Sequence, residues 1–168
     1  MKKQIKAISM VSLLAAAFTV SAAQRDITVT AEIDPTVDIT LANGSPLPTT
    51  ATMQYLPGKG LADYNEQVKL WSNTADRDLL VSLVNEPKLT DSNGTNSIDL
   101  SVKLNGSVLT TTSTTMPFAT TFPNGIANGS SAMPLVISQA NPGPATSAGS
   151  YSGIVSIVVA QAAAANKP

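Results

Sequence analysis

The most regular stretch of this sequence is ITVTAEIDPTVDITL, residues 27–41. Its odd-numbered positions are all apolar and its even-numbered positions are all polar. An alternation of period two buries one face of a β-strand and leaves the other face in water. These fifteen residues, at roughly 3.3 Å each, would span about 50 Å, which is longer than a usual strand. Pro35 lies near the middle, where it cannot donate a ladder hydrogen bond, so the stretch divides there.

Two interpretations of this division are open from the residues alone. In the first, both halves are consecutive strands of one sandwich, bent at Pro35. In the second, residues 37–41 belong to the core of this subunit, and residues 27–33 form an arm that adds a strand to another subunit, a mode known as β-augmentation. Pro35 would then be the hinge between arm and body. The pocket-filling residues of the arm would be Ile27, Val29, Ala31 and Ile33.

Residues 1–22 have the features of a secretory signal peptide. Lys2, Lys3 and Lys6 precede an uncharged apolar run at residues 7–20, and small residues follow. That run is too short for a permanent membrane span, and no second run of about 20 apolar residues follows. We therefore expect an exported chain without stable membrane insertion, cleaved after Ala22 or Ala23.

The composition after cleavage limits the function classes. Residues 23–168 number 146, enough for one domain, and we expect the body to be residues 35–168. Removing the three leader lysines leaves 7 of 10 basic residues against 11 acidic ones, a net charge of −4, which argues against nucleic acid and anionic membranes as partners. The sequence has no histidine and no cysteine, so it lacks the residues of Ser-His-Asp, Cys-His and ordinary zinc sites. We expect neither an enzyme nor a cofactor.

Strand and turn signals run through the chain after the leader. Five Asn-Gly pairs, at Asn43, Asn93, Asn105, Asn124 and Asn128, are typical of tight turns, and Asn105 marks the clearest hairpin. Short strands at this spacing, without a helical period, predict an all-β sandwich with exposed connections at 112–133 and 140–149. The expected strands are 26–33, 36–41, 51–55, 67–72, 79–84, 98–104, 107–111, 135–139 and 150–159.

The last of these strands is apolar on both faces, which indicates that both faces need cover. It is a candidate lip for the groove that an arm would fill. Gly153 would leave space for the close approach of a partner, although a glycine at this place can equally be a weak point or a bulge in an ordinary terminal strand. The groove residues expected on this strand are Tyr151, Gly153, Val155, Ile157 and Val159.

Two other groups of residues could suggest a ligand site. Trp71 and the three tyrosines could stack on sugars, but they are few and scattered, which favours core packing. Asn73, Asp76 and Asp78 offer oxygen ligands of the kind that calcium takes, but Arg77 lies between the acids and the spacing matches no known loop, which favours a polar turn.

Four blocks of the sequence resemble a known family: DITVTA at 26–31 with Asp34-Pro35 following, PKLTD at 87–91, LVIS at 135–138 and GSYSGIVS at 149–156. They are similar to the major subunits of the alternate chaperone-usher (class 5) fimbriae, a group that includes the colonisation factor antigen I and Burkholderia cable pilus subunits. The similarity extends through nearly the whole chain after the leader. It places the mature N-terminus at Ala23, and it implies that the arm is residues 23–34.

This resemblance implies an incomplete immunoglobulin-like β-sandwich that is completed by donor-strand exchange. The expected partners are other copies of the chain in a head-to-tail homopolymer, a periplasmic chaperone, an outer-membrane usher and a minor tip subunit. The product would be an adhesive fimbria on the cell surface. The tail at residues 160–168 is longer than the family predicts, which leaves open where the terminal strand ends.

A fimbrial adhesin or a carbohydrate-binding module is the alternative function. Adhesins of chaperone-usher systems carry a receptor domain ahead of the pilin domain, for which this chain has no room. Direct binding of a host receptor by the repeated subunit stays open.

Overall fold

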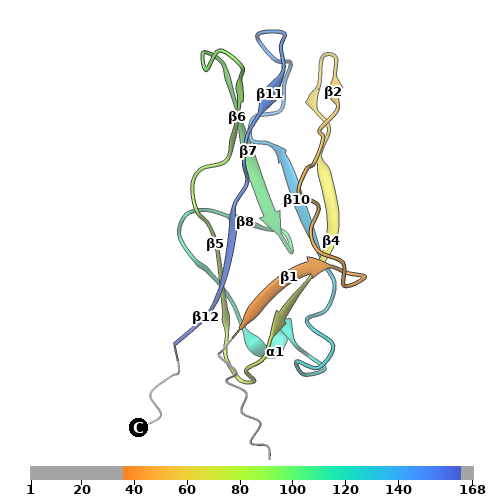
Figure 1. Cartoon of the computed structure of the whole chain (residues 1–168), viewed down its shortest axis with the longest axis vertical. Coiled ribbons are helices and arrows are strands. Elements are labelled where there is room, and N and C mark those ends of the chain that lie inside the picture. The colour runs from red at the N-terminus through yellow and green to blue at the C-terminus, as the bar shows by residue number, and fades with distance from the viewer. Residues whose placement is uncertain (1–35, 164–168) are drawn as a thin grey trace, which may run out of the picture. The chain divides into compact units, whose positions relative to one another are not determined.

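A computed structural model describes residues 36–163 of the chain (Figure 1). The expected signal peptide, the arm at residues 23–34 and the hinge at Pro35 lie outside the described residues. Within the described part the secondary structure is almost entirely β, with one short helix. None of the helical segments described there is long and apolar enough to cross a bilayer.

The strands form a large sheet and a small sheet, and all their pairings are antiparallel. The large sheet has the order β1-β4-β10-β7-β6-β11, with β8 paired to β7, and the small sheet has the order β12-β5-β9; β2 and β3 form a separate ribbon. The elements are β1 (Val37–Leu41), β2 (Tyr55–Leu56), β3 (Gly60–Leu61), β4 (Tyr64–Ser72), β5 (Leu79–Leu83), β6 (Lys88–Asp91), β7 (Ser97–Leu104), β8 (Ser107–Leu109), β9 (Thr114–Met116), α1 (Phe118–Thr121), β10 (Met133–Gln139), β11 (Tyr151–Ser152) and β12 (Ile157–Gln161).

The core lies between the two sheets and is built from alternate residues of their strands. Leu79, Val81 and Leu83 of β5 are 0, 0 and 3% exposed, and they meet Val68 and Leu70 of β4 in one hydrophobic cluster. Burial of an aliphatic side chain of this size contributes roughly 1.5–3 kcal/mol. The expected all-β sandwich is therefore confirmed.

Most expected strands exist, but several boundaries and elements differ. Residues 51–54 form no strand, and the expected strand at 150–159 is interrupted between β11 and β12, ending at Gln161. The expected connection at 112–133 contains β9 and α1. The short strands β3 and β6 also carried no recognised signal, because strands of two to four residues are too short to display a period.

All five Asn-Gly pairs lie in turns, as expected. Their glycines, Gly44, Gly94, Gly106, Gly125 and Gly129, all have positive φ. In the β7–β8 hairpin Asn105 also has positive φ, at 50°, and Gly106 has 81°, which is the backbone that a two-residue hairpin of the primed type requires.

The β6–β7 hairpin is closed by Asp91. Its two carboxylate oxygens accept hydrogen bonds from the Thr95 backbone N–H and the Asn96 side-chain amide, each at 2.8 Å. The Asn96 amide bond, supported by nearby backbone N–H groups, holds the pKa of Asp91 below its usual value. The hairpin thereby holds β6 against β7.

Ser130 pairs with the backbone of β4 at Leu70, in the place that a neighbouring strand would take. It is 2% exposed, its hydroxyl accepts a hydrogen bond from the Leu70 backbone N–H at 2.9 Å, and its own N–H donates to the Leu70 carbonyl at 2.8 Å. The neighbouring Gly129 packs on Trp71, where a Cβ would lie 3.1 Å from two ring carbons. This loop therefore closes the edge of the core beside Leu70.

We expect Ser130→Ala to lower the free energy of unfolding by about 1–3 kcal/mol, because the buried Leu70 N–H would lose its acceptor. Equilibrium urea unfolding of the mature chain measures this difference. Ser131→Ala is the matched control, since Ser131 is exposed and its hydroxyl makes no hydrogen bond within residues 36–163. Equal stability of the two variants would contradict the proposed role of Ser130.

Candidate functional site

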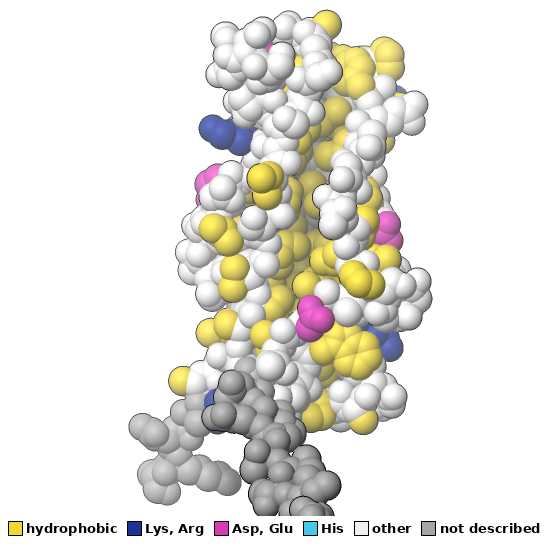
Figure 2. Space-filling model, viewed as in Figure 1, with side chains coloured by type: hydrophobic (Ala, Val, Ile, Leu, Met, Phe, Trp, Pro, Cys, Tyr) yellow, Lys and Arg dark blue, Asp and Glu magenta, His cyan; other side chains and the backbone are white. Residues whose placement is uncertain are grey.

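An open groove of about 930 Å³ lies beside the large sheet. In the space-filling view, hydrophobic side chains line a hollow that runs between two ridges (Figure 2). One lip is the irregular segment at residues 47–53, and the other is the C-terminal segment at residues 151–157. The floor consists of Leu89, Ile98, Leu100, Leu135 and Ile137.

The floor continues the inward face of the large sheet beyond the point where the small sheet covers it. Along β7, Val102 and Leu104 are 0 and 2% exposed and belong to the core cluster between the sheets. Ile98 and Leu100 have the same parity, so they point to the same side of the sheet, but they lie in the groove. The groove is thus the part of the sandwich core that has only one sheet.

The C-terminal lip crosses from one sheet to the other. β11 pairs with β6 of the large sheet, and β12 pairs with β5 of the small sheet. Residues 153–156, between them, belong to no strand of the described part. The segment therefore lines the groove while its ends are held by two different sheets.

Four of the five groove residues expected from the sequence line this cavity: Tyr151, Gly153, Val155 and Ile157. The fifth, Val159, lies on β12 opposite Val81 and packs against the core cluster instead. Their role as an acceptor for another subunit's arm is still a prediction.

The backbone that comes close to Gly153 belongs to the same chain. A Cβ at Gly153 would collide with the Lys88 carbonyl oxygen and would lie 3.2 Å from the Leu89 Cα, both on β6. The sequence suggested space for a partner at this position, or a bulge, and the structure shows a crossing over the subunit's own strand. The glycine is required because β6 leaves no room for a side chain.

The three tyrosines lie at the groove rather than in the core, which corrects the expectation of core packing for them. Tyr55 is 43% exposed, and Tyr64 and Tyr151 are half-buried. The Tyr64 hydroxyl donates to Glu66 Oε1 at 3.2 Å, and the Tyr151 hydroxyl donates to the Ser147 carbonyl at 3.0 Å. Burial, followed by the charge of Glu66, raises the pKa of Tyr64.

Trp71 and the possible calcium ligands have structural contacts. The Trp71 indole N–H donates to Thr40 Oγ1 at 2.8 Å, joining β4 to β1. Asn73 Oδ1 accepts from the Thr36 N–H and Asp78 Oδ1 from the Phe118 N–H, both at 2.8 Å. Residues 36–163 contain no cluster of three acidic residues that could hold a metal ion. The group at 73–78 is a polar turn, as the sequence favoured.

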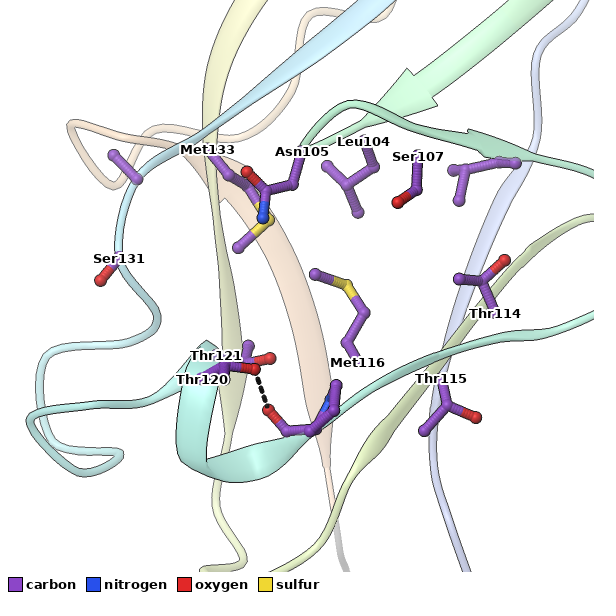
Figure 3. A pocket seen from close by; sticks show the side chains of 13 residues that line it. Leu104, Asn105, Ser107, Thr114, Thr115, Met116, Thr120, Thr121, Ser131 and Met133 are labelled. Atoms are coloured by element: carbon purple, nitrogen blue, oxygen red, sulfur yellow. Dashed lines mark hydrogen bonds between the residues drawn. The ribbon is translucent and has the colours of Figure 1, made fainter.

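A second cavity, of about 230 Å³, opens between the β7–β8 turn and α1 (Figure 3). Met116 and Met133 contribute its apolar surface, and Asn105, Thr114 and Thr115 lie around its rim. No charged side chain lines it, so it offers no general acid or base.

The sequence analysis missed the second lip and the floor. Residues 47–53 carry no periodic signal, since they cover the groove without forming a strand. The floor residues were visible as apolar positions in expected strands, but a sequence pattern does not distinguish a position covered by a second sheet from one left open. PKLTD at 87–91, which carries Leu89, was recognised as a family block and not as a strand.

Comparison with known proteins identifies the family to which this chain belongs. The family model for the CS1 type fimbrial major subunit matches residues 23–160. The chain belongs to this family. It is therefore a structural fimbrial subunit, and its sandwich is the immunoglobulin-like fold of pilins that polymerise by donor-strand exchange.

Individual relatives align with this chain over nearly the whole length of both sequences. The chain is 36% identical over 167 residues to a CFA/I fimbrial subunit of Escherichia coli O78:H11, covering 94% of this chain and 96% of the relative. It is 32% identical over 169 residues to a CS1 fimbrial subunit of Escherichia coli, with coverages of 95 and 96%.

Two solved structures share the fold. The CooA pilin subunit from enterotoxigenic Escherichia coli matches with a TM-score of 0.68 at 28% identity, over 79% of this chain and 91% of that one. A chain from a chaperone-tip adhesin complex of CFA/I fimbriae matches with a TM-score of 0.54 at 13% identity, over 76% of this chain and 42% of that one, and this second likeness concerns the fold alone.

We expect Gly153→Ala to destabilise the subunit by about 1–3 kcal/mol, because the added methyl group overpacks the crossing at Lys88. Urea unfolding of the mature chain measures the loss. Gly143→Ala is the matched control, since a Cβ there meets nothing within 4 Å. If both alanine variants matched the parent, the crossing would not be tight.

Proposed function

We propose that the groove accepts the N-terminal arm of another copy, residues 23–34, with Ile27, Val29, Ala31 and Ile33 directed at its floor. The observation that carries this proposal is the uncovered apolar strip on the inward face of the large sheet, in a chain that belongs to a family of fimbrial major subunits. An added strand would supply both the missing apolar cover and the missing hydrogen-bond partners of the C-terminal lip.

The length of the arm suits the lip. Residues 27–33 and residues 151–157 are both seven-residue stretches, and seven residues in a strand extend about 20 Å. The alternation of the arm directs its four apolar residues to one face, and the floor offers five apolar side chains to meet them. Its polar residues Thr28, Thr30 and Glu32 would then face outward.

The energetics favour a long-lived joint. Burying Ile27, Val29 and Ile33 contributes roughly 1.5–3 kcal/mol each, and each strand hydrogen bond adds roughly 0.5–1.5 kcal/mol net. A head-to-tail contact of this kind is heterologous, so it produces an open filament unless its rotation closes a ring. The same arm that completes one subunit thereby links it to the next.

Assembly before the exchange requires a temporary cover for the groove. We assign this role to a periplasmic chaperone, encountered after cleavage of residues 1–22, with transfer to the next arm at an outer-membrane usher and a minor subunit at the fibre tip. Pro35 lies between the arm and β1, and its missing N–H and restricted φ suit a hinge that ends one strand before the next begins. A host receptor would contact the assembled fibre.

The central test moves the arm. Deleting residues 23–34 should leave a subunit that does not polymerise, because no copy can complete its neighbour. Attaching the same segment after Pro168 through a flexible linker should restore a stable monomer whose groove is filled by its own chain. Size-exclusion chromatography and thermal unfolding measure both outcomes. The matched control is the same graft carrying Val29→Asp, which should not stabilise the monomer. An arm-deleted chain as polymeric as the parent would exclude the exchange.

A single substitution tests which face of the arm enters the groove. Val29→Asp should abolish fibres, because it places a charge in an apolar site at a cost of several kcal/mol. Thr28→Asp, one residue away on the opposite face, should assemble normally. Electron microscopy of cells expressing each variant, with immunoblots for subunit level, gives the result. Normal fibres from Val29→Asp would reverse the facing assignment.

A further inference from the structure

The five Asn-Gly pairs occupy two different places in their turns. In four of them the glycine is the last residue of the turn, and its N–H donates to the carbonyl three residues earlier. These bonds join Gly44 to Leu41 at 2.9 Å, Gly94 to Asp91 and Gly125 to Phe122 at 3.0 Å, and Gly129 to Ile126 at 3.1 Å. The fifth pair, Asn105-Gly106, takes the two central positions of the β7–β8 hairpin, between the paired residues Leu104 and Ser107.

The backbone N–H of Gly106 has no partner in the described part of the chain. In a four-residue turn the last residue donates to the first, and the N–H of the third residue is not used. The Gly106 N–H makes no hydrogen bond within residues 36–163, and neither does the Asn105 side chain. All five asparagines are exposed, so access to water does not distinguish the pairs. The unbonded glycine amide distinguishes Asn105-Gly106 from the other four.

An unbonded amide nitrogen beside an asparagine is a nucleophile for its side chain. When the Gly106 nitrogen gives its proton to hydroxide, it attacks Asn105 Cγ, and the side-chain amide nitrogen takes up a proton and leaves as ammonia. The product is a five-membered succinimide ring. Water opens this ring at either carbonyl, which gives aspartate or isoaspartate. Glycine favours the attack because it has no Cβ beside the nitrogen.

We propose that Asn105 is a site of spontaneous deamidation, and that it converts faster than the other four Asn-Gly pairs. Every pair must flex for the ring to close, but the other four must also break the hydrogen bond of their glycine. Asn43 is restrained further, because its Oδ1 accepts a hydrogen bond from the Ser45 N–H at 2.9 Å. The β7–β8 turn is thus the place where a subunit acquires a carboxylate as it ages.

The modification changes the second cavity, because Asn105 lies at its rim (Figure 3). No charged side chain lines this cavity, and either product adds one carboxylate there. Isoaspartate also adds a methylene group to the backbone between Leu104 and Ser107, which a two-residue hairpin does not accommodate without losing register. β8 carries Leu109, which is 4% exposed, so isoaspartate loosens one attachment to the core. The large groove has no lining residue in this turn and is unaffected.

The five pairs lie in one chain, so each sample contains its own controls. We incubate purified fibres, and in parallel the same chain unfolded in urea, at mildly alkaline pH. Peptide mass spectrometry with fragmentation specific for isoaspartate follows each asparagine separately. In fibres Asn105 should convert about two- to tenfold faster than each of the other four, the factor that one net hydrogen bond supplies. In urea the five rates should converge, because the turns that distinguish the pairs are lost.

Conversion of Asn105 no faster than another Asn-Gly pair in fibres would overturn the proposal. Formation of aspartate without isoaspartate would also overturn it, because that product pattern bypasses the succinimide. If the rates differed in urea as they do in fibres, the local sequence would set them, and the role of the unbonded amide would be rejected.

A variant separates this site from other sources of charge. Asn105→Gly removes the reacting side chain and keeps the turn, because Gly-Gly also suits a primed hairpin. On isoelectric focusing, its aged fibres should lack the main acidic band that aged parent fibres acquire. Asn43→Gly, the matched control, should keep that band. Persistence of the band in Asn105→Gly would assign the charge to another residue and contradict the proposal.

Discussion

The organising constraint in this molecule is that the large sheet is longer than the small sheet that covers it. A sheet with one apolar face is stable only when that face is buried against another layer. Along β7, Val102 and Leu104 are buried in the core cluster beneath β5, Leu100 is 7% exposed where it borders the groove, and Ile98 lies beyond the small sheet. The open part cannot be closed by the described chain, because the available segments, residues 47–53 and 151–157, stand at its two sides as lips. The missing cover has the dimensions of one strand.

The C-terminal segment makes this opening possible. Had residues 151–161 run in one sheet as a continuous strand, they would have packed over the floor or left it entirely. Instead the segment leaves β6, crosses at Gly153 where only a glycine fits over the Lys88 carbonyl, and joins β5. The crossing holds the lip at both ends and leaves its middle, at residues 153–156, outside any strand in residues 36–163. A rigid frame around an unfilled space is the condition for tight insertion, because little further ordering is needed when a partner strand enters.

The sequence predicted the parts of this design that depend on local chemistry. Alternation located β1, strand-forming residues between turn signals located β5 and β7, and the five Asn-Gly pairs located turns. These signals depend on side-chain period, on residue type and on backbone freedom at positive φ. Local chemistry does not specify which side chains are covered by a second layer of the fold. The tyrosines were expected in the core but line the groove, and residues 51–53 were expected in a strand but form part of a lip. Both errors have one cause: whether a position meets a second layer is decided by residues distant in the sequence. The family resemblance supplied that non-local information.

The composition of the terminal strand follows from the same constraint. An edge strand of an ordinary sandwich alternates, with one face apolar and one polar, whereas a strand buried on both faces is apolar throughout. β12 carries Ile157 and Val159 on its inner face and Val158 and Ala160 on its outer face, so it has the composition of a central strand. In the proposed exchange it would become one in position, because the arm would be added at its free edge. Its outer face still has no cover from residues 36–163, and the polar outer side of the arm supplies none. The composition of β12 therefore suits a strand that gains a neighbour at its free edge.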